Sequence, residues 1–112
     1  MDCLFCKIVA GEIPSNIVHQ DDDVIAITDI NPQAPHHIVV MPRKHFANVA
    51  ELAGSGSPDL LAQLFSTAAR IGREQDARGF RIVVNTGPLA GQTVDHVHVH
   101  VLAGRPMAWP PG

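Results

Sequence analysis

The stretch His96-Val97-His98-Val99-His100-Val101-Leu102 places a histidine at every second position, with apolar residues between them. Alternation with a period of two is typical of a β-strand with one buried face. The valines are therefore expected to point into a core, and the three imidazoles to line the other face about 6–7 Å apart. Because imidazole titrates near neutral pH, such a row suits proton transfer, nucleophilic attack or metal binding. An accidental polar strand face is the remaining interpretation.

The composition narrows the class of protein. A chain of 112 residues, 46% of them apolar, is expected to form one domain (1–112) with a real core. The net charge is −3 and the Lys and Arg residues are scattered, which argues against a nucleic-acid partner. Apolar runs stay below the ~18 residues of a membrane span and the amino end lacks the pattern of a signal sequence. We therefore expect a cytoplasmic protein with no membrane partner and with reduced thiols.

Local patterns predict an α+β fold in which an antiparallel sheet of about five strands carries one main helix and a short amino-terminal helix. The expected strands cover residues 17–20, 24–28, 37–41, 81–85 and the histidine stretch. The short helix is expected over 3–10 with Asp2 as its cap, and the main helix from an N-cap at Ser57 to about Ala77. The main helix should cover one face of the sheet and leave the other face to the histidines.

The segment between the last two predicted strands carries donors for an anion. Residues 85–93, Asn-Thr-Gly-Pro-Leu-Ala-Gly-Gln-Thr, bring glycines, an amide and a hydroxyl to the start of the histidine strand. Glycines let backbone N–H groups approach a ligand closely, and successive N–H groups form an anion-binding nest. Such a loop is more often a plain turn, but beside three histidines it indicates an oxyanion or phosphate site.

The stretch from His96 to Leu102 resembles the motif of the histidine triad (HIT) family, which is His-φ-His-φ-His-φ-φ with φ apolar. Further motifs resemble the Hint-like branch, in the bacterial type with an amino-terminal Cys-x-x-Cys, and the resemblance covers nearly the whole chain. These motifs are Glu12-Ile13-Pro14, the segment 29–35, Gly91-Gln92-Thr93-Val94 and the ending Trp109-Pro110-Pro111-Gly112.

The resemblance implies a homodimer whose sheets join, and a purine nucleoside phosphoramidate hydrolase acting through a nucleotidyl-histidine intermediate. His98 matches the nucleophile, which would attack the α-phosphorus and expel an amine. His100, His37, Asn85, Thr93 and the loop amides of Gly91 and Gln92 match phosphate-contacting positions. Thr93 stands where serine is usual and would help to protonate the leaving group.

Further positions of the resemblance concern the nucleoside. Asp29 matches the carboxylate that binds both ribose hydroxyls, although a turn-forming aspartate is the alternative. Ile30, with Leu4, Phe5, Ile8 and Ile27, would form an apolar slot for the base, unless these residues are ordinary core. Trp109 belongs to a tail that, in Hint proteins, reaches the partner subunit's active site.

Cys3 and Cys6 allow three interpretations: surface thiols, a redox pair or a metal site. A thioredoxin-like pair should follow a strand of a βαβ unit, which the sequence does not provide. The resemblance implies a structural zinc held by Cys3, Cys6, His45 and His96, with no metal required for the chemistry.

Two departures from the family pattern concern the phosphate loop. Asp95 stands where an aromatic residue is usual, and Pro88-Leu89-Ala90 makes the loop less rich in glycine. Two other functions stay open: a dinucleoside polyphosphate hydrolase, and a nucleotide-binding interaction protein with vestigial activity.

Overall fold

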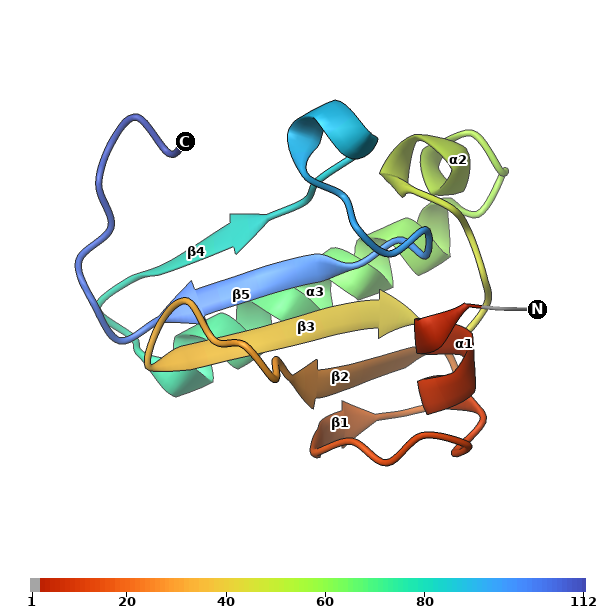
Figure 1. The fold of residues 1–112 in the computed structure, drawn as a ribbon, viewed down its shortest axis with the longest axis horizontal. Helices are drawn as coiled ribbons and strands as arrows, with labels where there is room; N and C mark the ends of the chain where they lie inside the picture. The colour runs from red at the N-terminus through yellow and green to blue at the C-terminus, as the bar shows by residue number, and fades with distance from the viewer. Residues whose placement is uncertain (1–2) are drawn as a thin grey trace.

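The computed structural model describes residues 3–112, which form a five-stranded antiparallel sheet with helices on both faces (Figure 1). The strand order is β1-β2-β3-β5-β4. The elements are α1 (Leu4–Val9), β1 (Ile17–Gln20), β2 (Val24–Thr28), β3 (His36–Pro42), α2 (Val49–Ala53), α3 (Pro58–Gln75), β4 (Phe80–Val83), the 3₁₀ turn η1 (Pro88–Ala90) and β5 (Val99–Ala103). The α+β class and the antiparallel sheet predicted from the sequence are thereby confirmed. Within residues 3–112, no helix is long and apolar enough to cross a membrane.

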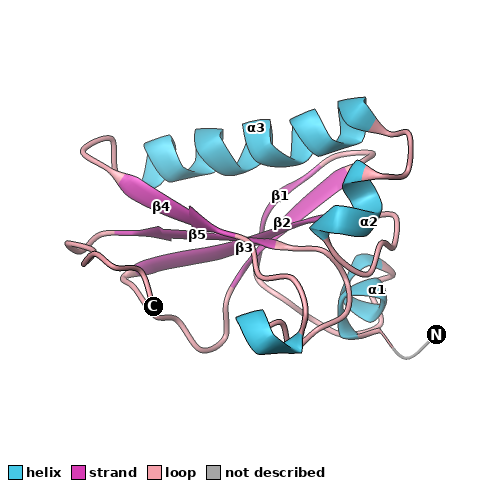
Figure 2. Cartoon of the chain, turned by 90° about the horizontal axis from the view of Figure 1, so that it is seen from above, coloured by secondary structure: helices cyan, strands magenta, loops and turns pink. Residues whose placement is uncertain are grey.

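One face of the sheet packs against α3, which lies over that face (Figure 2) and contacts β2, β3, β4 and β5. Val40, Val99 and Val101 point to this face and are fully or almost fully buried. The helix contributes Leu64, Ala68 and Ile71, which recur at helical spacing on one side of it. The valines between the histidines therefore enter the main core, as the alternation predicted.

The other face of the sheet is shared between α1 and the histidines. Ile25, Val39 and Met41 are buried on this face against Phe5 and Ile8 of α1. The central strands β2 and β3 read as continuous apolar runs because both of their faces are covered. The expectation that the second face is left to the histidines therefore holds only for the part beyond α1.

The histidine strand is shorter than predicted. Strand β5 begins at Val99, so His96, Val97 and His98 precede it. The backbone leaves the ladder because the His96 amide donates to Val94 O (2.9 Å) and the Val97 amide donates to Phe46 O (2.7 Å). Alternation still places Val97 in the main core, but His96 is carried off the sheet toward the amino-terminal helix.

Helix boundaries follow the predicted signals only in part. Pro58 opens α3 as predicted, but the Ser57 side chain makes no capping bond, and the helix ends at Gln75 and not at Ala77. In α1 the cap is Cys3, whose sulfur accepts from the Cys6 amide (3.4 Å), whereas the predicted cap Asp2 lies outside the described residues.

Helix α2 was not predicted from the sequence, although its start carries a recognisable signal. Asn48 Oδ1 accepts from the Glu51 amide (2.9 Å), and Glu51 Oε2 accepts from the Ala47 amide (2.8 Å). This arrangement resembles a capping box, in which an N-cap side chain and an acid three residues later satisfy amides reciprocally. Strand β4 likewise ends at Val83, so Asn85 lies beyond it and not inside it.

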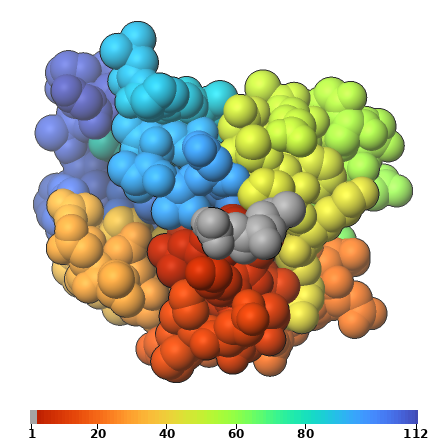
Figure 3. Space-filling model, turned by 45° about the vertical axis from the view of Figure 1, so that its right-hand side comes forward, coloured from red at the N-terminus to blue at the C-terminus, as the bar shows by residue number. Residues whose placement is uncertain are grey.

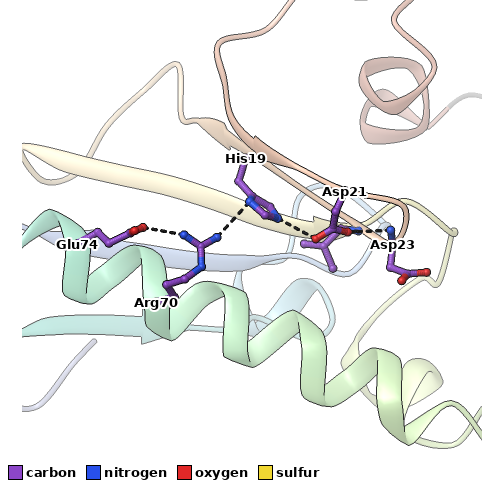
Figure 4. A network of polar contacts seen from close by, with 6 residues as sticks. His19, Asp21, Asp23, Arg70 and Glu74 are labelled. Carbon is purple, nitrogen blue, oxygen red and sulfur yellow. Dashed lines mark hydrogen bonds and ion pairs between the residues drawn. The ribbon is translucent and has the colours of Figure 1, made fainter.

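The edge strand β1 is tied to α3 by a polar network (Figure 4). Arg70 donates to His19 Nδ1 (3.1 Å) and pairs with Glu74 one turn further along α3 (2.8 Å). The other ring nitrogen of His19 donates to Asp21 (2.8 Å), whose carboxylate also accepts from the amides of the turn before β2. His19 thus serves the fold on the face of the sheet that α3 covers, opposite to His98 and His100.

Candidate functional site

The His98 ring has one nitrogen whose role is fixed by the backbone. His98 Nδ1 lies 2.7 Å from the carbonyl oxygen of His96. A carbonyl only accepts, so Nδ1 carries the proton and Nε2 keeps its lone pair. Burial lowers the pKa of His98, while the bond to His96 and the charge of Asp29 oppose this shift. The ring is therefore held neutral, in the tautomer in which Nε2 can act as a nucleophile.

His37 and His100 form an oriented chain of hydrogen bonds beside His98. The Gln33 amide donates to His37 Nδ1 (3.0 Å), so the proton of a neutral His37 is on Nε2. His37 Nε2–H then donates to His100 Nδ1 (2.9 Å). This leaves the proton of His100 on Nε2, where it is a donor, and the His100 ring lies 5.0 Å from the His98 ring. A lone pair on His98 and a donor on His100 are thus adjacent.

The electrostatics favour neutral imidazoles throughout this group. Burial, aided by the neighbouring His98 and His37, lowers the pKa of His100 to about 4. Burial also lowers the pKa of His37, against the opposing charge of Asp29. Three adjacent imidazoles could not all be charged without strong mutual repulsion, and burial removes the water that would screen it.

Cys3, Cys6, His45 and His96 form a compact group at the other end of the histidine stretch. His96 Nδ1 lies 3.4 Å from Cys3 Sγ, 3.5 Å from Cys6 Sγ and 3.2 Å from His45 Nδ1. Cys6 Sγ lies 3.3 Å from His45 Nδ1, and all four atoms are within 4.8 Å of one another. A tetrahedral zinc with ordinary bond lengths places two nitrogens about 3.3 Å apart, and a nitrogen and a sulfur about 3.5 Å apart. The spacing and the donor types therefore fit zinc.

The hydrogen bonds of this group also suit a metal. His96 Nε2 donates to Pro42 O (2.8 Å), which leaves the lone pair on Nδ1, the atom that faces the thiols. Burial and the nearby Cys3 raise the pKa of the Cys6 thiol, a shift that a bound cation would oppose. Figure 3 shows α1 lying between the segment after β3 and the loop before β5, the two segments that bring His45 and His96 to it.

Asp29, His37 and His100 are a second group close enough to hold a metal. Their hydrogen bonds oppose it, because the Gln33 amide occupies His37 Nδ1 and the proton therefore sits on the Nε2 that would have to bind. Asp29 Oδ2 lies 3.4 Å from that Nε2, as an acceptor would. We interpret this group as a chain of hydrogen bonds and not as a metal centre.

The predicted phosphate loop is more closed than expected. The amides of Gly91 and Gln92 donate to Pro88 O and Gly87 O (both 3.1 Å), so the turn η1 uses the donors that the resemblance assigned to phosphate. The side chain of Gln92 is buried: it accepts from the Gly87 amide and donates to Ala47 O and Val94 O. Gln92 therefore braces the loop against the segment before α2, while Thr93 is exposed and Asn85 is half-buried.

The residues predicted for the nucleoside fall into two groups. Asp29 Oδ1 accepts from the Asn31 amide (2.8 Å), so this aspartate does form a turn, with Oδ2 directed to His37. Phe5, Ile8 and Ile27 are buried in the second core cluster, whereas Ile30 is fully exposed and Leu4 partly so. Trp109 is 82% exposed in the carboxyl-terminal tail, which is available for contact with another molecule.

The partners that fix the histidine rings could not be found from the sequence. Gln33 N, Pro42 O and His96 O are backbone atoms, and a backbone atom leaves no residue-type signal. Phe5 is a further functional neighbour, because its ring lies edge-on to His98 with centroids 4.9 Å apart.

Comparison with known proteins places these features in a family. The family model described as HIT domain matches residues 10–107. A HIT family hydrolase from Legionella pneumophila Philadelphia 1 is 41% identical, with a TM-score of 0.93 over 99% of this chain and 100% of that chain. The adenylylsulfatase HINT1 of Arabidopsis thaliana is 43% identical over 97% of this chain and 76% of its own length. A 14 kDa zinc-binding protein of Brassica juncea is 42% identical over 99% of this chain and 100% of its own length. The chain belongs to the HIT domain family.

Proposed function

We propose that the protein is a hydrolase that converts a purine nucleoside phosphoramidate, such as adenosine 5′-monophosphoramidate, to AMP and an amine. The observation that carries the proposal is the tautomer of His98: Nδ1–H is bound to His96 O and the Nε2 lone pair is left for phosphorus. A pure binding module would not need a nucleophile held in this way. The similar HIT family hydrolase from Legionella pneumophila supports the same class.

The reaction proceeds in two displacements. His98 Nε2 forms a bond to the α-phosphorus as the P–N bond to the amine breaks, and the amine leaves with a proton that Thr93 helps to deliver. Water then attacks the nucleotidyl-histidine and gives up a proton, which replaces the one that the amine took; AMP is released and His98 Nε2 recovers its lone pair. The negative charge on the non-bridging oxygens grows or spreads in each step, so fixed donors around them lower both barriers.

His100 is the donor that the structure prepares for this charge. Its Nε2–H is oriented by the chain from the Gln33 amide through His37. Asn85, Thr93 and the loop at Gly91 and Gln92 would complete the phosphate contacts after η1 opens. Asp29 would bind the ribose hydroxyls, Ile30 would cover the base, and Trp109 would contact the substrate from the tail.

The metal has a structural role in this proposal. A bound zinc would hold Cys3, Cys6, His45 and His96 in a tetrahedron and supply folding free energy. The 14 kDa zinc-binding protein of Brassica juncea supports this assignment. The four residues fasten α1 to the sheet, and the chemistry is left to His98 and His100.

We also propose that the protein is a homodimer. Strand β4 is one edge of the sheet, and its Phe80 is 37% exposed. An uncovered edge with an exposed aromatic side chain is a ready surface for pairing with a second strand. Pairing of two β4 strands would join the two sheets and bring one tail near the other subunit.

One specific observation favours a second substrate. The Arabidopsis relative is named an adenylylsulfatase, and adenylylsulfate offers the same α-phosphorus with sulfate as the leaving group. Dinucleoside polyphosphate hydrolysis and nucleotide binding without catalysis remain as alternatives from the sequence.

Initial rates on three substrates test the proposal. We expect adenosine 5′-monophosphoramidate to have a higher kcat/KM than adenylylsulfate and diadenosine tetraphosphate. His98→Asn should lower kcat by about a thousand-fold or more, because the nucleophile is lost. His19→Asn is the matched control, since His19 lies in the β1–α3 network, and it should keep wild-type rates. Wild-type turnover in His98→Asn would rule out the mechanism. A higher kcat/KM for adenylylsulfate would show that adenylylsulfate, and not the phosphoramidate, is the preferred substrate.

A further inference from the structure

The Phe5 ring contacts both His98 and His96. Phe5 is 8% exposed on α1, and its ring centroid lies 4.9 Å from that of His98, at an interplanar angle of 83°. The same ring lies 6.0 Å from His96, at 79°. Edge-to-face pairs at these separations are favourable and have a preferred geometry. Phe5 is therefore in direct contact with the ring proposed as the nucleophile, and next to a ligand of the metal group.

One hydrogen bond and two ring contacts limit how the His98 ring can move. The hydrogen bond from Nδ1 to His96 O fixes one atom of the ring. The rest of the His98 ring can still tilt about that atom. Phe5 and His100 both contact the ring edge-on, with centroids 4.9 and 5.0 Å away. Tilting the ring displaces Nε2, the atom opposite the fixed end. The side contacts are thus what sets the direction of the lone pair.

Two cysteines lie close to Phe5 in the sequence of the short helix α1. Helix α1 has six residues, which is too short to be stable without support. Cys3 and Cys6, on either side of Phe5 in the sequence, both lie within 3.5 Å of His96 Nδ1. A metal bound by these thiols would fasten α1 to the segment that carries His98.

We propose that the Phe5 ring positions the His98 imidazole, and that metal binding by Cys3 and Cys6 keeps Phe5 in place. Phe5 is a positioning residue in this account, and the metal acts on the nucleophile through it. The link to turnover rests on the proposed function, whereas the link to the His98 ring does not.

The test is nuclear magnetic resonance of the imidazole nitrogens in the full chain, with zinc added. In the wild type we expect His98 to show a single tautomer with a slowly exchanging Nδ1–H. Phe5→Leu keeps an apolar side chain and all four ligands but removes the ring, and it should broaden the His98 signals or mix its tautomers. Phe5→Met is the second variant should Phe5→Leu fold poorly. Val9→Ala, which also removes apolar volume from α1, is the matched control and should leave His98 unchanged.

Chelation and kinetics complete the experiment. Removing zinc from the wild type should change the His98 imidazole signals in the same way as Phe5→Leu does. Removing zinc from the Phe5→Leu variant should change these signals little further. Phe5→Leu should retain wild-type zinc stoichiometry and lose between about 10- and 100-fold in kcat, with a smaller change in KM. A role in base binding alone would change KM instead.

Three results would overturn the proposal. His98 signals unchanged in Phe5→Leu would remove the positioning role, and a change as large in Val9→Ala would make it unspecific. A chelated protein with wild-type His98 signals would remove the part played by the metal. Failure of the proposed substrates in the wild type would leave the resonance measurement valid, so the two proposals fail separately.

Discussion

Backbone atoms decide the protonation of the histidine rings at the residue scale. The carbonyls of Pro42 and His96 can only accept, and the amide of Gln33 can only donate. His96 is thereby left with a lone pair on Nδ1, His98 with a lone pair on Nε2, and the His37–His100 pair with a donor at His100 Nε2. Three chemically identical side chains in one motif thereby differ in their hydrogen bonding, in the way that the three proposed roles require.

The depressed pKa of His100 makes stability depend on pH. Burial and two neighbouring imidazoles lower this pKa from 6.5 to about 4 in the folded protein. Between these values the unfolded chain binds the proton and the folded protein does not, so stability is complete above pH 6.5 and is lost as pH falls toward 4. Because the ring is only half-buried and solvent screens part of the effect, the contribution amounts to about 1–2 kcal/mol. His100→Gln should flatten this part of the curve of unfolding free energy against pH.

Urea unfolding between pH 4 and 7 measures this effect. A chelator is present throughout, so that release of metal at low pH does not contribute. His36→Asn serves as the control, since His36 is exposed beside His37 on the other side of β3, and it should follow the wild type. A His100→Gln curve parallel to that of the wild type would contradict the assignment.

At the scale of elements, α3 meets β4 at a glycine. A Cβ atom added to Gly72 would overlap the ring of Phe80. Gly72→Ala should therefore destabilise the fold by about 1–3 kcal/mol, although alanine is the better helix former. In a Phe80→Ala background the same substitution should stabilise the fold by up to about 1 kcal/mol, because only the helix propensity remains.

Urea unfolding of the wild type, both single variants and the double variant measures the effect of Gly72→Ala on the free energy of unfolding with and without the Phe80 ring. Equal effects of Gly72→Ala with and without the Phe80 ring would show that the close approach does not determine the residue at position 72.

Elements with local signals were predictable, and those with distant causes were not. Pro58 and the stripe containing Leu64, Ala68 and Ile71 predicted α3 because a helix repeats its own pattern. The histidine strand was predicted too long, since the residue at which it begins depends on the distant carbonyl of Phe46. Helix α2 had a local signal in Asn48 and Glu51 that the sequence interpretation did not use.

The candidate site divides in the same way. Its residue types were predictable from the histidine motif, the cysteine pair and the family resemblance, and the structure brings Cys3, Cys6, His45 and His96 together as expected. The state of the phosphate loop was not predictable, because it depends on which carbonyls accept from the amides of Gly91 and Gln92.

At the scale of the whole molecule, the main core and the candidate site lie on opposite faces of one sheet. Helix α3 covers one face, and α1, which contributes Cys6 to the proposed zinc site, covers part of the other. The remaining part carries His37 on β3, His100 on β5 and His98 directly before β5, so the site rests on paired strands whose positions the core already fixes. A site on rigid strands needs only its last side chains to be oriented.

Native mass spectrometry tests the assembly proposed for the whole molecule. We expect a mass of twice 12.0 kDa, with one zinc in each chain. Cys6→Ser removes one thiol ligand and should lose the zinc while keeping the dimer, because the metal group lies on α1 and not on β4. Lys44→Ala, next to His45 but outside the group, should keep both. A monomer, or zinc retained in Cys6→Ser, would contradict the corresponding assignment.

The central claim is that His98 Nε2 attacks phosphorus, and the covalent intermediate tests it most directly. Wild-type protein turning over adenosine 5′-monophosphoramidate is quenched in alkaline denaturant, which preserves phosphorus–nitrogen bonds, and its peptides are analysed by mass spectrometry. We expect one adenylyl group, localised to His98 and missing from His98→Asn. Rapid turnover with no adduct on the wild type, or an adduct on another residue, would contradict the account.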